Sequence, residues 1–159
     1  MGGNPEFESR QDRDPRKLYD KALKRILGET YETELIEILR QRRFITDGYL
    51  PSLSLPPQRH ERSEARYLFD FYQGKDRILV PIMWPYKRTS LHFHIDPIWE
   101  TYEVLRGELY LNGTLIPPGG LTVPPGLLHQ TETRGQHALT LIVMKDASSV
   151  PEAQQHASI

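Results

Sequence analysis

The sequence predicts a mainly β fold, an antiparallel sandwich or small barrel that follows an N-terminal helical extension. The spacing of apolar residues supports this, because its period changes along the chain from about 3.6 to about 2, the periods of a helix and a strand. Beyond Tyr67, short strand-like segments are separated by Pro-Gly, Asn-Gly and Gly-Gly turns, and no helical pattern interrupts them. The 159 residues suffice for one domain with one sizeable core.

Two amphipathic helices are predicted ahead of the β region. The first begins at Asp14-Pro15, where Asp can act as the N-cap and Pro is tolerated at the first helical position, and it ends at Gly28. The second runs from Thr30 to about Arg43. Each carries an apolar face that needs cover, so we expect the helices to pack on the barrel or across a dimer interface.

The remaining chain is predicted to form short strands around one core. We expect a disordered segment over residues 1–13, a helical extension and linker over 14–60, the barrel over 61–147 and a flexible tail over 148–159. The expected strands comprise 67–71, 77–84, 89–95, 100–113, 114–116, 120–123, 129–133 and 138–144.

Composition excludes several classes of protein. The formal net charge of −1 gives no global field that favours nucleic acid or an anionic membrane. The absence of cysteine excludes a disulfide framework, a thiolate metal site and a cysteine nucleophile. No apolar run approaches the roughly 18 residues of a membrane span, and the polar start has no signal-peptide core. We therefore expect a soluble, cytoplasmic protein without a nucleic-acid or membrane partner.

Two histidines one residue apart in a strand-like stretch, His92 and His94, suggest a metal site. Side chains alternate along a strand, so both imidazoles project to one face while Leu91 and Phe93 point to the other. A turn through Ile95–Ile98 is expected to fold the following strand beside the first.

That following strand supplies a carboxylate and a hydroxyl on one face, Glu100 and Tyr102, and His129 follows a Pro-Pro-Gly turn further along. Three neutral imidazoles and one carboxylate are a ligand set for Fe, Mn, Ni, Co or Zn. The alternative is that the histidines make separate hydrogen bonds, which is the usual reading of a lone histidine. We predict one divalent metal held by His92, His94, Glu100 and His129.

The histidine segment resembles the first motif of the cupin superfamily. That motif runs His-x-His, three or four residues, Glu, six residues and Gly. Here His92-x-His94 is followed by five residues, Glu100, six residues and Gly107. The extra residue leaves Glu103 as a weaker alternative ligand, but Glu100 keeps the spacing to Gly107.

The second cupin motif, Pro-x-Gly-x-x-His, corresponds to Pro124-x-Gly126-x-x-His129. Two positions depart from the family pattern. Pro118 replaces a Gly six residues before the motif, and Thr133 replaces an Asn after the last His.

The resemblance spans roughly Tyr67 to Met144 and implies a small single-domain cupin. For the fold it implies a jelly-roll β-barrel with the metal inside, and pairing of two barrels into a homodimer. There is local likeness to the small cupins of O-antigen gene clusters (the WbuC type). The Glu100-x-Tyr102 and Val123-Pro124-Pro125 stretches are also similar to cupin-type phosphoglucose isomerases. Neither likeness names a substrate.

Three functions remain open at this point. The chain is interpreted first as a metal-dependent enzyme on a small polar molecule, either an isomerase or epimerase of the sugar type or an O₂-dependent dioxygenase. In that case Tyr102, which shares a face with Glu100, is the candidate general acid/base; packing alone is the competing interpretation. The second reading is a sensor that binds metal and a small ligand without turnover. The third is a structural barrel whose helices mediate assembly, and the complete ligand set argues against it.

Overall fold

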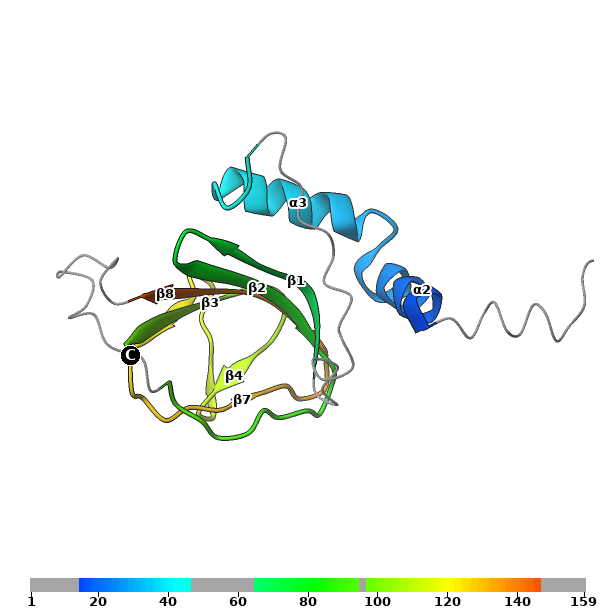
Figure 1. Cartoon of the computed structure of the whole chain (residues 1–159). Coiled ribbons are helices and arrows are strands. Elements are labelled where there is room, and N and C mark those ends of the chain that lie inside the picture. Colours follow the sequence, from blue (N-terminus) through cyan, green and yellow to red (C-terminus); the bar gives the residue numbers. More distant parts are fainter. Residues whose placement is uncertain (1–14, 47–64, 95–96, 147–159) are drawn as a thin grey trace, which may run out of the picture. The chain divides into compact units, whose positions relative to one another are not determined.

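The computed structural model describes residues 15–46, 65–94 and 97–146 (Figure 1). The predictions for residues 1–13 and 148–159, and for most of the linker, lie outside this range. Within it, the predicted mainly β jelly-roll fold is confirmed, with two short helices preceding two antiparallel sheets. The chain divides into two compact units, Met1–Leu50 and Pro51–Ile159.

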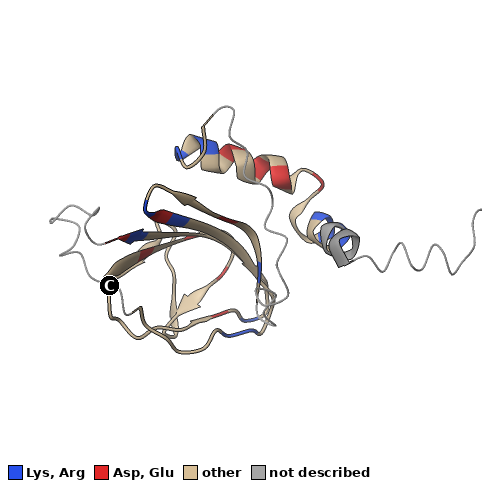
Figure 2. Cartoon of the chain, in the orientation of Figure 1, with Lys and Arg blue, Asp and Glu red and all other residues tan. Residues whose placement is uncertain are grey.

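The first unit contains the two predicted helices, α2 (Pro15–Leu27) and α3 (Tyr31–Gln41). Gly28 ends α2 with a φ of 104°, a left-handed conformation that glycine adopts at little cost. Acidic residues lie in the first turn of α3 and Arg40 lies in its last turn, as the helix dipole favours (Figure 2). None of the described helices is both long and apolar enough to cross a membrane.

The second unit consists of two antiparallel sheets (Figure 1). The larger sheet has the order β1-β2-β8-β3-β6 and the smaller one β5-β4-β7. The strands are β1 (Ala65–Gln73), β2 (Asp76–Met83), β3 (Ile98–Gly107), β4 (Tyr110–Leu111), β5 (Thr114–Leu115), β6 (Leu121–Val123), β7 (Thr131–Glu132) and β8 (Ala138–Asp146).

The core between the sheets comes from alternate residues of these strands. It includes Leu79, Tyr102, Leu111 and Val123, all of them buried. β2 is buried on both faces, which explains its continuous apolar run. Pro81 lies in this central strand at a gap in the β2–β8 pairing, which runs to Leu79 and resumes at Ile82 in the same register.

The predicted strand over residues 89–95 is wrong in the part that the structure describes. Only two single bridges form, between Arg88 and Glu132 and between His92 and His129. Two backbone amides in this region donate to threonine hydroxyls instead of to backbone carbonyls. The amide of Thr131 donates to Thr89 Oγ1 at 3.0 Å, and that of Lys87 to Thr133 Oγ1 at 3.1 Å. Side chains of this kind compete with a regular ladder, which sequence periodicity does not reveal.

The expected pairing of this segment with the following strand is also wrong. β3 pairs with β8 on one side and β6 on the other, and the histidine segment pairs with the stretch around His129. The segments that carry the two motifs therefore meet through a long-range contact.

Gly107 closes β3 where no other residue fits. Its φ is 77°, and a Cβ atom built on it would lie 1.8 Å from the carbonyl oxygen of His137. The backbone of the first motif thus passes directly against the start of β8.

We expect Gly107→Ala to destabilise the fold by more than about 3 kcal/mol, because strained backbone and a backbone clash add. Gly113→Ala is the matched control, since Gly113 has a φ of 80° and nothing within 4 Å of a built Cβ. That variant should lose only about 1–2 kcal/mol. Urea unfolding of both variants measures the difference, and equal losses would contradict the close approach at Gly107.

Candidate metal centre

The structure brings the four predicted ligand residues together at one place. One side-chain nitrogen or oxygen from each of His92, His94, Glu100 and His129 lies within 4.8 Å of the others. Glu103 is not in this group and lies on the alternate face of β3 by strand parity. The spacing to Gly107 favoured Glu100 over Glu103, and Glu100 is the carboxylate that faces the barrel interior.

The two motifs are joined by a pair of main-chain hydrogen bonds between His92 and His129. Each amide donates to the other residue's carbonyl, at 3.0 Å and 2.8 Å. This exchange sets the two imidazoles side by side, with ring centroids 4.2 Å apart. Leu91 and Phe93 are exposed. The predicted alternation of side chains between two faces is therefore present, although the segment does not form a regular strand.

Backbone carbonyls fix the tautomer of two of the imidazoles. His92 Nδ1 lies 2.7 Å from the carbonyl oxygen of Ser90, and His129 Nδ1 lies 2.9 Å from that of Leu127. A carbonyl can only accept, so each Nδ1 carries the proton and each Nε2 keeps its lone pair for another partner. Carbonyl contacts of this type orient metal-binding histidines.

The lone pair of His129 has no hydrogen-bond partner among the described residues. The residue is completely buried, and its Nε2 lies 3.1 Å from Glu100 Oε1 without hydrogen-bond geometry. Two acceptor atoms at this distance repel each other unless a proton or a cation lies between them. This buried nitrogen fits a bound cation.

Glu100 is the centre of the group. Its Oε1 lies 2.8 Å from His94 Nε2, and its Oε2 accepts a hydrogen bond from Tyr102 at 2.9 Å. Burial by itself raises the pKa of this carboxyl, but interactions with His129 and His94 outweigh it and hold the pKa below its usual value. Glu100 is thus an anion at neutral pH, as a metal ligand must be.

Tyr102 lies on the face of β3 that parity predicts, but its hydroxyl is closer to the cluster than expected. Instead of reaching past the metal, it donates to the ligand Glu100. Burial and then the negative charge of Glu100 raise the pKa of Tyr102 well above its usual value. The phenol therefore keeps its proton at neutral pH and holds the carboxylate in place.

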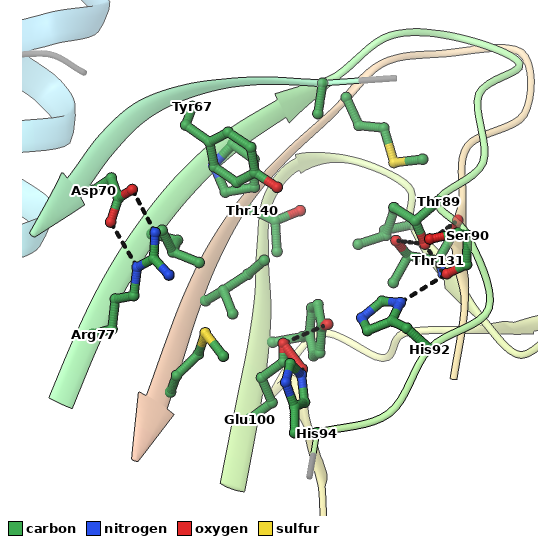
Figure 3. A pocket seen from close by; sticks show the side chains of 18 residues that line it. Tyr67, Asp70, Arg77, Thr89, Ser90, His92, His94, Glu100, Thr131 and Thr140 are labelled. Atoms are coloured by element: carbon green, nitrogen blue, oxygen red, sulfur yellow. Dashed lines mark hydrogen bonds and ion pairs between the residues drawn. The ribbon is translucent and has the colours of Figure 1, made fainter. Parts of the chain in front are cut away.

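A cavity of about 490 Å³ lies beside the cluster (Figure 3). Its wall includes His92, His94, Glu100 and Tyr102, together with apolar side chains such as Leu79 and Ile142. The sequence did not single out its other polar members, which are Tyr67, Asp70, Arg77, Thr89, Ser90, Thr131 and Thr140. Strand alternation could have predicted some of them. Arg77, for example, lies two residues from Leu79 on β2, and both side chains face the cavity.

The residues present fit a divalent first-row metal. The set offers three imidazole nitrogens and one carboxylate, with no sulfur, which suits Fe, Mn, Ni, Co or Zn and does not choose among them. The ligands come from the two motifs, and those motifs converge inside a jelly roll. Both the fold and the motifs resemble those of cupins.

Solved structures similar to this chain include several cupins. A double-stranded β-helix protein from Klebsiella pneumoniae is 16% identical, with 58% of this chain and 89% of that chain covered and a TM-score of 0.46. The Cupin_2 domain of an XRE-family transcriptional regulator from Enterobacter cloacae is 17% identical, with 50% and 92% covered and a TM-score of 0.43. A cupin-superfamily sugar phosphate isomerase from Silicibacter pomeroyi is 21% identical, with 46% and 52% covered and a TM-score of 0.39.

No protein-family model and no curated protein matches the sequence. Similarity at this level assigns neither a substrate nor a reaction to the barrel.

We expect the untagged protein to carry close to one divalent metal per chain, and His92→Ala combined with His94→Ala to lose it, because only two ligands remain. Elemental analysis after dialysis measures the metal. His137→Ala is the control, since His137 lies outside the cluster and should leave the metal content unchanged. Full retention of metal by the double variant would exclude the assigned ligands.

Proposed function

We propose that this cupin is a metal-dependent enzyme acting on a small polar molecule. The single observation that supports this is the position of the ligand cluster, which forms part of the wall of a cavity of about 490 Å³ and so leaves room for a substrate beside the metal. A metal held by His92, His94, Glu100 and His129 would act as a Lewis acid toward an oxygen of that substrate.

The chain's own residues supply orientation and a dry environment. Ser90 and Leu127 hold two imidazoles by their backbone carbonyls, and Tyr102 holds Glu100. Leu79, Leu109 and Ile142 line the same cavity and limit the water around the cluster. Isomerisation or epimerisation of a sugar-like molecule and O₂-dependent oxidation both remain compatible with this arrangement.

A second candidate is a binding module that anchors a small ligand on the metal without turnover. One observation favours it. The hydroxyl of Tyr102, the predicted acid/base, is already committed to Glu100 rather than free toward the cavity.

A screen of the metal-loaded protein separates these functions. Sugar phosphates, nucleotide sugars and small hydroxy or keto acids are incubated with the protein in air and without oxygen, and products are measured by mass spectrometry. Turnover without oxygen supports an isomerase or epimerase, and turnover with stoichiometric O₂ uptake supports an oxygenase. Ligand binding without any product would favour the binding module.

We expect Tyr102→Phe to reduce turnover by roughly 10²-fold or more, the contribution of a positioned acid/base group. Loss of the hydrogen bond to Glu100 should also weaken metal affinity by about tenfold, since outer partners of metal ligands contribute at this level. Turnover is measured on protein saturated with metal, so that occupancy does not limit the rate, and metal affinity is measured by titrating the metal-free protein.

Tyr110→Phe is the matched control for this variant. Tyr110 donates to Glu108, two residues away, at 3.2 Å, the same tyrosine–glutamate spacing at an exposed site. It should change neither turnover nor metal affinity. If Tyr102→Phe left turnover unchanged, Tyr102 would have no acid/base role and would serve only in packing.

A further inference from the structure

An ion pair forms part of the cavity wall away from the metal cluster. Arg77 donates from Nε to Asp70 Oδ1 at 2.8 Å and from Nη2 to Asp70 Oδ2 at 2.7 Å, a two-point contact that fixes the guanidinium. Figure 3 shows this pair on one side of the cavity, with Ser90 and His92 on the other. Arginine has five N–H donors, so three remain for a ligand.

The strand register places Arg77 within reach of a ligand held at the metal. Arg77 on β2 and Glu100 on β3 both pair with Met144 on the intervening strand β8. Neighbouring strands lie about 4.8 Å apart, so the two backbones are about 10 Å apart on the same face. A molecule of monosaccharide size spans that interval.

Thr140 adds a second polar point on the wall. It is 2% exposed, it lines the cavity, and its hydroxyl makes no hydrogen bond to another described residue. Figure 3 shows its oxygen directed into the space between the ion pair and His92. Because this hydroxyl lines the cavity and no other described residue occupies it, it is available to a ligand group.

The charges on the wall indicate what kind of molecule fits. Asp70 and Arg77 cancel each other, and Glu100 neutralises only one charge of a divalent ion. One positive charge at the metal is left for a ligand anion, while the far wall is polar and neutral. The cavity thus calls for one negative group at the metal and hydroxyl groups elsewhere.

We propose that the cavity binds a small polyhydroxylated monocarboxylate, with its carboxylate end at the metal and its distal hydroxyl groups on Arg77 and Thr140. This inference rests on the proposed function and specifies its substrate class. Asp70 acts as a selectivity residue, because its carboxylate compensates Arg77 and disfavours a phosphate at the distal end of the ligand.

The test measures binding of three probes to the full, metal-loaded chain by calorimetry. Gluconate carries a carboxylate and a distal hydroxyl chain, 6-phosphogluconate carries a phosphate at the distal end, and glycolate is too short to reach from the metal to Arg77. We expect gluconate to bind more tightly than either of the other probes.

Substitutions in the wall should act only on the long probes. Thr140→Val, which keeps the side-chain shape, should weaken gluconate binding by about three- to tenfold, and Arg77→Gln by about tenfold. Neither should change the affinity for glycolate or the metal content. Asp70→Asn should improve 6-phosphogluconate binding by about tenfold, because it leaves the charge of Arg77 uncompensated.

Arg40→Gln is the control for the loss of an arginine–carboxylate pair, since Arg40 pairs with Glu37 at the surface of α3 at 3.1 Å. It should leave all three affinities unchanged. The inference would be overturned if gluconate binding were undetectable. It would also be overturned if gluconate bound equally well to the native protein, Thr140→Val and Arg77→Gln. In either case, protein that still carries metal would uphold the metal site. Absence of bound metal in the native protein would overturn the proposed function itself.

Discussion

The site depends on two hydrogen bonds between the main chains of His92 and His129. These bonds join segments that are far apart in the sequence, and further main-chain bonds, from Thr89 to Thr131 and from Thr133 to Lys87, continue the contact on one side. Because the pair exchanges both donors and acceptors, the two side chains must leave the backbone on the same face. His94 and the inward face of β3 then complete the group. If this contact were displaced by one residue, Phe93 or Leu91 would occupy the place of a ligand.

Electrostatics explains why such a group is stable in an otherwise apolar interior. Burying a carboxylate such as Glu100 is unfavourable unless charges or donors compensate it. The imidazoles of His94 and His129 and the hydroxyl of Tyr102 surround both of its oxygens. The contact between His129 Nε2 and Oε1 nevertheless brings together two acceptors, since the other nitrogen of that ring is committed to Leu127. A bound cation removes this conflict, as does a second proton on the ring, whose pKa the carboxylate of Glu100 raises against the effect of burial. The geometry of the site therefore fits a metal.

Much of the fold and the ligand cluster was predictable because the signals are local. The alternation around His92, the spacing from Glu100 to Gly107 and the turn before His129 are all read within a few residues. The pairing of His92 with His129 was not predictable in this way, because the choice of partner depends on long-range register and on threonine hydroxyls that replace backbone acceptors. The cavity wall was missed for a different reason, because its polar side chains belong to no motif. Asp70 and Arg77 lie on neighbouring strands, and only the pairing of β1 with β2 shows that they meet.

The isolated bridge between the two motifs also bears on the dynamics of the barrel. The segments that carry His92 and His129 are joined by single bridges and separate backbone hydrogen bonds, whereas β2, β3 and β8 form long ladders. An ion bound by His92, His94, Glu100 and His129 then cross-links these two segments to the larger sheet through Glu100. Part of the free energy of ion binding is spent on ordering these segments. Ion occupancy and the order of the segments are therefore thermodynamically coupled. Depletion of the ion would loosen these two segments before the sheet itself unfolds.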